Sequence, residues 1–400
     1  MIERTEYIDQ LKAYREKQLI KVITGVRRCG KSTLFALYID YLKSTGVTDD
    51  QIVSVNLEDI EHEGLLEYKV LYNYIKEHLH KSKFTYVFID EVQNCKFYEK
   101  AVDSLFIKPR VDLYITGSNA YMLSGELVTF LSGRYISIDM LPLSFCEYCQ
   151  APLSLGKSAH ENFSDYLRFG SFPYVSVLER NDFIITPYID GIYNTILVKD
   201  VARREGITDI PLLESIVKFV AGNIGSPVST KKISDSINSS GRKISVNTVD
   251  NYLRVLTDSY IFYKANRYDI KGKQHLKTLG KYYIVDTGIR NILLSGSASD
   301  IGHLIENIVY LELLRRGQQV NIGKLAEKEI DFVASDRNGI TYYQVAASVL
   351  DENILRRELE PLQKITDNHP KVLLTLDDVG AGGNYDGIRQ INLIDWLMKK

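Results

Sequence analysis

The segment ITGVRRCGKSTL, residues 23–34, restricts the fold of this chain more than any other stretch. Gly25 to Ser32 have the spacing GxxxxGKS, with an apolar, β-rich run before them and a helix-forming run, STLFALYIDYL, after the glycines. Such a loop wraps phosphates in backbone N–H groups, and the N-terminus of the following helix adds partial positive charge. Spacing and setting together predict a phosphate-binding loop of an α/β domain, rather than a glycine turn before an ordinary helix.

The residues of this loop have separate predicted roles toward ATP and Mg²⁺. Gly25 and Gly30 let the backbone turn and approach the phosphates closely. Lys31 reaches the β- and γ-phosphates, the Ser32 hydroxyl binds Mg²⁺, and Thr33 is expected near the α-phosphate. The variable positions are assigned only added positive charge near the phosphates, and they hold Arg27, Arg28 and Cys29.

Two acids follow the apolar run TYVFID, and they predict hydrolysis as well as binding. An acid at the carboxyl end of a parallel strand points into the crevice where ligands bind. We expect Asp90 to hold Mg²⁺ through water and Glu91 to polarise the attacking water as general base. The run DLYITGSN ends in polar groups suited to sensing the γ-phosphate, Thr116, Ser118 and Asn119.

Arg134, in LSGRYISID, precedes the last strand-like run of this region. An arginine that neutralises charge in the transition state speeds phosphoryl transfer, so Arg134 is a candidate catalytic finger or sensor. A solvated surface arginine explains the sequence equally well. If Arg134 acts in trans, the active form is a homo-oligomer.

Composition sets broad limits on location and partners. The chain holds 49 basic and 51 acidic side chains, a net charge of −2 that names no partner. No segment has 18 or more uninterrupted apolar residues and the N-terminus has no apolar signal-peptide core, which predicts a cytoplasmic protein without a membrane partner. Cys146 and Cys149 form a CxxC, but no second ligand pair completes a zinc site, so we expect a structural role.

The chain resembles a large prokaryotic family of AAA-like P-loop ATPases over essentially its whole length. The resemblance rests on the segments GVRRCGKSTL, FIDEVQ, ITGSNA, LSGRY followed by LPLSFCEY, and FGSFPY. It implies an α/β P-loop NTPase core with a doubly wound parallel sheet, a winged helix, and a C-terminal α/β restriction-endonuclease-like domain of the PD-(D/E)xK nuclease type. The predicted divisions are a P-loop ATPase domain at 1–150, a helical connector or lid at 151–210, a winged helix at 211–294 and the nuclease-like domain at 300–400.

The predicted winged helix carries a local excess of positive charge. Residues 229–254 hold five basic and two acidic side chains, and residues 264–281 hold six and one. In NTVDNYLRVLTDS the apolar residues share one helical face, which turns the polar ones to the other face. Phosphates set the affinity of such a surface for double-stranded DNA, while amides and guanidinium groups read bases. The candidate DNA contacts are Asn247, Asn251, Arg254, Lys271, Lys273 and Lys277; packing of the wing against protein is the alternative.

The C-terminal region keeps only part of a nuclease pattern. Glu306 lies in a helical run, Asp331 in the strand EIDFVA and Gln344 in the strand TYYQVA. The resemblance implies a (D/E)xK tripeptide where this chain has Gln344, Val345 and Ala346. A neutral amide binds Mg²⁺ more weakly than a carboxylate, so we expect a degenerate, noncatalytic site. A lysine or arginine from elsewhere could fill the missing role, the candidates being Lys324, Lys328 and Arg356.

Three functional hypotheses remain open on the sequence. The first is a Mg²⁺-dependent ATPase that switches or remodels a DNA-associated complex. The second is a nucleotide-dependent signalling or assembly switch that binds only protein. The third is an ATP-regulated nuclease.

Overall fold

The computed structural model describes residues 2–120, 131, 133–203, 206–239, 241–295 and 301–399, without the side chains of 203 and 277–279. These residues form two compact units. The first unit contains residues 1–142 and 258–260, and the second contains residues 143–257 and 261–400. Apart from residues 258–260, the segments predicted from the sequence at 211–294 and 300–400 therefore lie in one unit.

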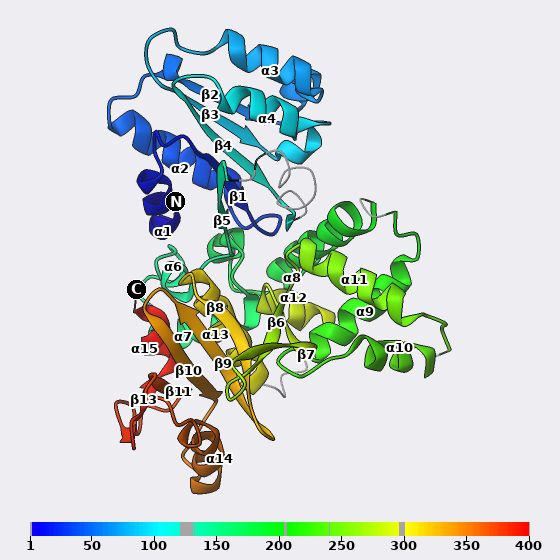
Figure 1. Cartoon of the computed structure of the whole chain (residues 1–400), viewed down its shortest axis with the longest axis vertical. Helices are drawn as coiled ribbons and strands as arrows, with labels where there is room; N and C mark the ends of the chain where they lie inside the picture. Colours follow the sequence, from blue (N-terminus) through cyan, green and yellow to red (C-terminus); the bar gives the residue numbers. More distant parts are fainter. Residues whose placement is uncertain are drawn as a thin grey trace. The chain divides into compact units, whose positions relative to one another are not determined.

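The first unit is built on a five-stranded sheet whose strands all run parallel (Figure 1). The strand order is β2-β3-β4-β1-β5, with bounds β1 (Ile20–Thr24), β2 (Ile52–Asn56), β3 (Thr85–Asp90), β4 (Val111–Gly117) and β5 (Tyr135–Asp139). The α-helices that the structure describes in it are α1 (Thr5–Ala13), α2 (Lys31–Ser44), α3 (Tyr68–Glu77) and α4 (Tyr98–Phe106). The predicted α/β fold with a parallel sheet is confirmed.

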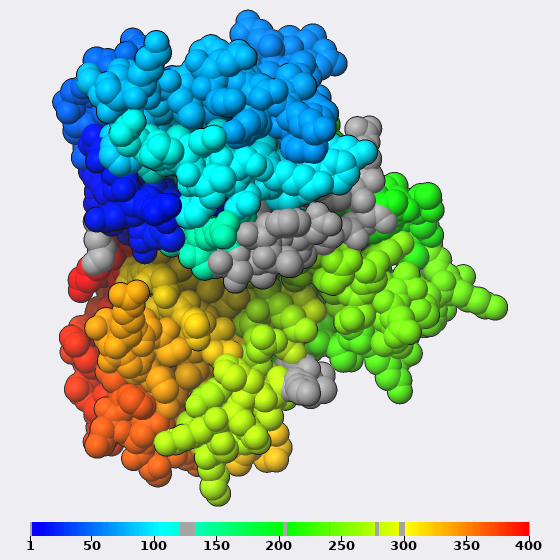
Figure 2. All heavy atoms as spheres, turned by 45° about the horizontal axis from the view of Figure 1, so that its top comes forward, coloured from blue at the N-terminus to red at the C-terminus, as the bar shows by residue number. Residues whose placement is uncertain are grey.

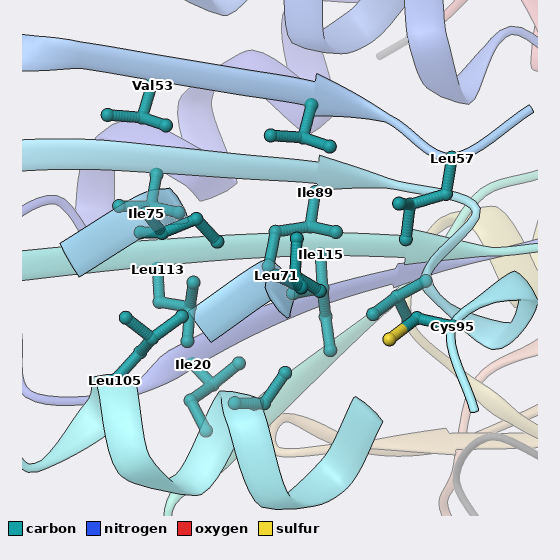
Figure 3. Packing of buried hydrophobic residues seen from close by; sticks show 14 of the residues in the cluster. Ile20, Val53, Leu57, Leu71, Ile75, Ile89, Cys95, Leu105, Leu113 and Ile115 are labelled. Carbon is teal, nitrogen blue, oxygen red and sulfur yellow. The ribbon is translucent and has the colours of Figure 1, made fainter. Parts of the chain in front are cut away.

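Helices cover both faces of this sheet because its strands are apolar on both sides. On one face, side chains of α3 and α4 such as Leu71 and Leu105 pack against β-strand residues such as Ile89 and Ile115 (Figure 3). On the other face the packing is aromatic. Phe35 and Tyr38 of α2 pack against Phe88, and Tyr38 also packs against Tyr114, with ring centroids 5.0–6.3 Å apart. The sheet is therefore rigidly held, and its carboxyl edge carries the loops.

The second unit contains a larger mixed sheet of eight strands in the order β12-β13-β11-β10-β9-β8-β6-β7. Its strands are β6 (Phe262–Asp269), β7 (Gln274–Ile284), β8 (Gln319–Leu325), β9 (Lys328–Asp336), β10 (Gly339–Ala346), β11 (Lys371–Thr375), β12 (Asn384–Tyr385) and β13 (Ile388–Asn392). β6 pairs with β7 antiparallel and with β8 parallel. The hairpin expected to be a wing is thus continuous with the C-terminal strands.

Helices make up the rest of the second unit. They are α6 (Phe145–Cys149), α7 (Ala159–Phe169), α8 (Asp182–Thr195), a π-helical segment (Ile196–Arg203), α9 (Ile210–Gly222), α10 (Thr230–Ser239), α11 (Val246–Asp258), α12 (Thr287–Leu293), α13 (Ile301–Arg315), α14 (Glu352–Gln363) and α15 (Leu393–Met398). Among the residues that the structure describes, no helix has the length and apolar character needed to cross a membrane.

The motif FGSFPY forms a buried joint after α7. The backbone N–H and the hydroxyl of Ser171 both donate to the carboxyl group of Asp286, at 2.6 and 2.9 Å. A Cβ at Gly170 would lie 2.2 Å from Asp286 Oδ1, and Gly170 has φ +82°. Only glycine fits there, so this motif fixes α7 against the segment that begins α12.

Replacing Ile115 with alanine tests the core of the first unit. Ile115 of β4 is fully buried against the helices. The cavity left by the smaller side chain is expected to lower the free energy of unfolding by about 2–5 kcal/mol. Ile107→Ala is the matched control, because Ile107 is 65% exposed and its loss should change stability by less than about 0.5 kcal/mol. Urea unfolding followed by circular dichroism measures both, and equal losses would contradict the packing described.

Candidate functional site

The phosphate-binding loop has a backbone that only glycine can adopt at its first position. Gly25 has φ +149°, and a Cβ there would lie 2.1 Å from the carbonyl oxygen of Met140. The Met140 N–H in turn donates to the Thr24 carbonyl at 2.7 Å, which holds the two segments together. Gly30, at φ +106°, caps the N-terminus of α2. The loop therefore passes close to the Met140 backbone and leads into a helix N-terminus, which favours anions.

Arg4, which the sequence analysis did not single out, forms hydrogen bonds with the backbone of the loop. Its buried guanidinium donates to the Cys29 carbonyl at 3.1 Å and to the Leu141 carbonyl at 2.7 Å. One side chain therefore forms hydrogen bonds with a carbonyl of the loop and with a carbonyl of the segment after β5. No sequence pattern marks this arginine, because its partners are backbone atoms far along the chain.

Lys31 is buried at the loop with its ammonium group among oxygen atoms. Its Nζ donates to the carbonyls of Gly25 and Val26 at 3.1 and 3.4 Å and lies 3.4 Å from Glu91 Oε1. Burial alone would lower the pKa of Lys31, but neighbouring negative charges, including those of Glu91 and Asp90, outweigh it and raise that pKa. The cation is thus fully charged where a phosphate would enter, so the loop fits a nucleotide phosphate.

Asp90 lies at the carboxyl end of β3, where side-chain oxygen atoms from β3, β4 and α2 meet. Its carboxyl group accepts hydrogen bonds from the hydroxyls of Thr116 and Ser32. Burial raises the pKa of Asp90 and outweighs these hydrogen bonds, which act to lower it. The carboxyl group and a hydroxyl at the start of α2 are the hard oxygen ligands that Mg²⁺ prefers. These residues fit the predicted magnesium site.

Glu91 has a left-handed backbone conformation, φ +51°, immediately after β3. Its N–H donates to Thr116 Oγ1 at 2.9 Å, and its carboxylate accepts from Gln93 Nε2 and from Ser118. Burial acts to raise the pKa of Glu91, but the charge of Lys31 and the Gln93 hydrogen bond outweigh it and lower that pKa. Glu91 is therefore an ionised carboxylate at neutral pH, as a general base must be.

The other predicted nucleotide contacts also lie at this carboxyl edge. Thr33 is exposed in the first turn of α2, and Asn119 is buried directly after β4. Gln93 Nε2 also donates to Ser118 Oγ at 3.3 Å. The sequence reasoning missed Gln93, although its position two residues after the base was a usable signal.

Arg134, predicted as a catalytic finger or sensor in cis or in trans, does not lie beside the loop and the acids of this unit. β5 runs parallel to β1, with Tyr135 beside Ile20 and Asp139 beside Thr24. Arg134 precedes β5 at the amino edge of the sheet, whereas the loop leaves from the carboxyl edge. Its guanidinium pairs with Asp103 at 2.5 Å and lies over the Phe106 ring. A role in trans stays a prediction.

The predicted DNA contacts of α11 lie on its solvent face. Asn247, Asn251 and Arg254 are exposed, and Arg254 donates to Asn251 Oδ1 at 3.0 Å. Lys271 and Lys273 are exposed in the turn between β6 and β7. The side chain of Lys277 lies outside the described residues. The green segments α10 and α11 and the yellow-green turn form part of the surface in Figure 2.

Lys281, counted from sequence among the basic residues of the wing, is instead buried in the second unit. Its Nζ lies 3.0 Å from Glu306 Oε1 and 2.8 Å from Glu329 Oε1, and the Tyr283 hydroxyl donates to Glu306 at 2.7 Å. Burial opposes its charge, but Glu306, Asp331 and Glu329 raise the pKa of Lys281. A lysine does join the acidic residues, but it comes from β7 and not from the positions expected.

The remaining residues of the nuclease-like pattern are linked through the same cluster. The Val345 N–H donates to Asp331 Oδ2 at 2.9 Å, and Gln344 Nε2 donates to Glu358 Oε2 at 2.9 Å. Asp331 keeps some exposure as a residue, but burial of its carboxyl group and the charge of Glu306 raise its pKa well above the ordinary value. Across the described ranges, no group of three or more His, Cys, Asp or Glu side chains is arranged to hold a metal ion.

The CxxC pair lies in the short helix α6. Burial raises the pKa of the half-buried Cys149 thiol to about 11, and Cys146 adds to that shift. Metal binding and redox exchange need the thiolate, which this shift disfavours at neutral pH.

The fold and the loop define an AAA-type P-loop ATPase domain. Residues 17–149 match the family described as AAA domain, and residues 160–300 match a domain of unknown function, DUF8612. An "Uncharacterized protein" of Haemophilus influenzae is 38% identical over 408 residues, covering 100% of this chain and 99% of its own length. At that identity and coverage, the chain belongs to the same family as the Haemophilus protein.

More distant similarities extend to an archaeal protein and to solved structures. "Uncharacterized protein MJ1544" of Methanocaldococcus jannaschii is 29% identical over 389 residues, covering 90% of this chain and 83% of its own. The Walker-type ATPase paby2304 of Pyrococcus abyssi aligns with 74% of this chain and 96% of its own, at 15% identity and a TM-score of 0.49. The Orc1 protein of Aeropyrum pernix in complex with DNA aligns with 74% of this chain and 93% of its own, at 14% identity and a TM-score of 0.34.

Replacing Lys281 with methionine tests the buried charge cluster. Removing the ammonium group leaves buried carboxylates without their cation, and we expect a loss of about 3–5 kcal/mol in the free energy of unfolding at pH 7. The loss in the free energy of unfolding should be smaller at acidic pH. Lys281 lowers the pKa of Asp331, so its removal raises that folded-state pKa further above the unfolded value of about 4. A raised folded pKa gives stability below pH 4 that is lost as the pH rises.

The control for this variant is Lys328→Met, which removes an ion pair with Glu360 in which both side chains are about 40% exposed. An exposed pair contributes at most about 1 kcal/mol, without the same pH dependence. Urea unfolding between pH 4 and 8 distinguishes the two. If the two variants lose the same stability at every pH, Lys281 is not neutralising buried carboxylates.

Proposed function

We propose that this protein is a Mg²⁺-dependent ATPase that acts as a switch or remodeller on a DNA-associated complex. The observation that carries the hydrolytic part is the position of the Glu91 carboxylate, 3.4 Å from Lys31 and next to Asp90, at the edge from which the loop leaves. A protein that only bound nucleotide would not need an ionised base beside the phosphate-binding lysine.

In the proposed reaction each side chain has one task. The loop N–H groups and Lys31 bind the phosphates, and Ser32 and Asp90 hold Mg²⁺, which supplies charge neutralisation at the phosphates. Glu91 accepts a proton from the attacking water, and Gln93 and Ser118 keep its carboxylate oriented. Thr116 fixes both acids, since its hydroxyl bonds to Asp90 and to the N–H of Glu91.

The DNA part of the proposal is supported by the second unit. α10, α11 and the β6–β7 hairpin have the element order of a winged helix, and the polar face of α11 is exposed. The second unit also carries exposed basic residues on α10, before α11 and in the β6–β7 turn, namely Lys231, Lys232, Arg242, Lys243, Lys271 and Lys273. This distribution favours phosphate contact over packing against protein, which remains the alternative function.

We further propose that the C-terminal domain has the PD-(D/E)xK-like fold in a noncatalytic form. The Lys281 ammonium occupies the acidic cluster, and Gln344 is used in a hydrogen bond to Glu358. Both features act against binding a divalent cation. If the purified protein cleaves plasmid DNA with Mg²⁺ and Asp331→Ala abolishes the cleavage, this assignment is wrong.

Two variants test the hydrolytic site. Lys31→Ala should lose nucleotide affinity, whereas Glu91→Gln should bind ATP but hydrolyse it at least about 100-fold more slowly. Steady-state phosphate release and nucleotide titration separate these effects. Lys43→Ala is the control, because Lys43 is an exposed lysine in the last turn of the same helix. Wild-type turnover in Glu91→Gln would remove Glu91 from the mechanism.

A double variant, Lys271→Ala with Lys273→Ala, tests DNA binding through the turn. Each phosphate contact that is lost should reduce the slope of log affinity against log salt concentration by about 1, so we expect a reduction of about 2. The matched control neutralises Lys157 and Lys364, exposed lysines elsewhere in the second unit. Fluorescence anisotropy with a DNA duplex gives the slopes. If both double variants bind like the wild type, the turn does not contact DNA.

A further inference from the structure

Two adjacent arginines of the phosphate-binding loop differ in their surroundings. The side chain of Arg27 is only 11% exposed, whereas Arg28 is an exposed residue with a left-handed backbone, φ +69°. From the sequence, both arginines are assigned only positive charge at variable positions of the loop. The structure separates them, because the loop buries one guanidinium group and leaves the other in solvent.

The Arg27 guanidinium lies at the same edge of the sheet as the catalytic acids. It pairs with Glu58 through an Nη1–Oε1 distance of 2.7 Å. Glu58 follows β2, and the neighbouring Leu57 N–H donates to the Asp90 carbonyl at 3.1 Å. Lys31, the second cation of the loop, lies 3.4 Å from Glu91 at this edge. The loop therefore brings two cations to the edge that carries Asp90 and Glu91.

We propose that Arg27 is a catalytic residue that contacts the γ-phosphate of bound ATP, and that Glu58 holds it when nucleotide is absent. This inference rests on the proposed function. Lys31 and the base Glu91 must both reach the γ-phosphate region, and they lie 3.4 Å apart. The Arg27 guanidinium belongs to the same loop and is held by Glu58 at the same edge of the sheet. Its planar fork is well suited to pair with the γ-phosphate oxygens.

The role of Arg27 in the reaction is electrostatic. Water attacks the γ-phosphorus, an O–P bond forms, and the bond from that phosphorus to the bridging oxygen breaks. The water proton goes to Glu91, and ADP and phosphate leave. Arg27 transfers no proton; it neutralises charge on the γ-phosphate oxygens as the bond breaks. This supplies in cis the arginine that Arg134, at the opposite edge of the sheet, does not.

Glu58 is suited to releasing Arg27 when ATP binds. Its side chain is 40% exposed, so a carboxylate that loses its partner is solvated by water at little cost. The γ-phosphate brings a higher negative charge to the same guanidinium group. The exchange of one anion for another needs only a side-chain movement, and it makes Arg27 sensitive to ATP and not to ADP.

Binding ratios test this contact without relying on turnover. In the full-length protein with Mg²⁺, we compare the affinities for ADP and for a β,γ-imido analogue of ATP. Arg27→Ala should lower the preference for the analogue at least about tenfold and change ADP affinity by less than about threefold. Arg28→Ala should weaken both ligands alike and keep their ratio within about twofold. An unchanged ratio in Arg27→Ala, or an equal change in both variants, overturns the proposal.

Two further measurements complete the test. Arg27→Ala should lower kcat by about 1,000-fold, and Arg27→Lys should recover only part of it, because an ammonium group lacks the bidentate fork. Glu58→Gln should raise the preference for the analogue, and a ratio equal to that of the wild type would exclude Glu58 as the group that competes for Arg27. If the wild-type protein prefers the analogue but does not hydrolyse ATP, the proposed function fails, while the binding ratio of Arg27→Ala still decides whether Arg27 contacts the γ-phosphate.

Discussion

The carboxyl edge of the parallel sheet is the constraint on which the first unit depends. Parallel strands end together, so the loop after β1, the acids after β3 and the polar residues after β4 meet without any being near in sequence. The contact between Lys31 and Glu91 joins the first two groups, and Thr116 joins the third to both acids. A shift of any one of these strands by one residue in its register would separate the side chains of the loop, the acids and the polar residues.

The same edge explains why charge is concentrated in a small buried space. Lys31, Asp90 and Glu91 are all buried, which would be unfavourable for each alone. Lys31 and Glu91 support each other, because the pKa of Lys31 is raised and that of Glu91 is lowered, whereas burial raises the pKa of Asp90.

The second unit uses buried charge differently. Lys281 is enclosed by carboxylates from α13 and β9 and ties the hairpin β6–β7 to the strands that follow it. Around it, Asp331 and Gln344 are engaged by protein groups rather than directed at an open site. A buried lysine thus serves to hold two parts of one sheet together.

The sequence by itself determined the local chemistry of the first unit. GxxxxGKS, the apolar run before Asp90 and the alternation of strands and helices each depend on neighbouring residues, so the phosphate loop, the acids and the parallel sheet were predictable. Only the tertiary structure decided the rest, because those contacts join residues far apart in the chain. It placed Arg134 at the wrong edge, buried Lys281, set Gln93 on the base and Arg4 under the loop, and distinguished Arg27 from its identical neighbour. Two adjacent arginines have the same chemistry, and only the path of the backbone decides which one is largely buried in a pair with Glu58.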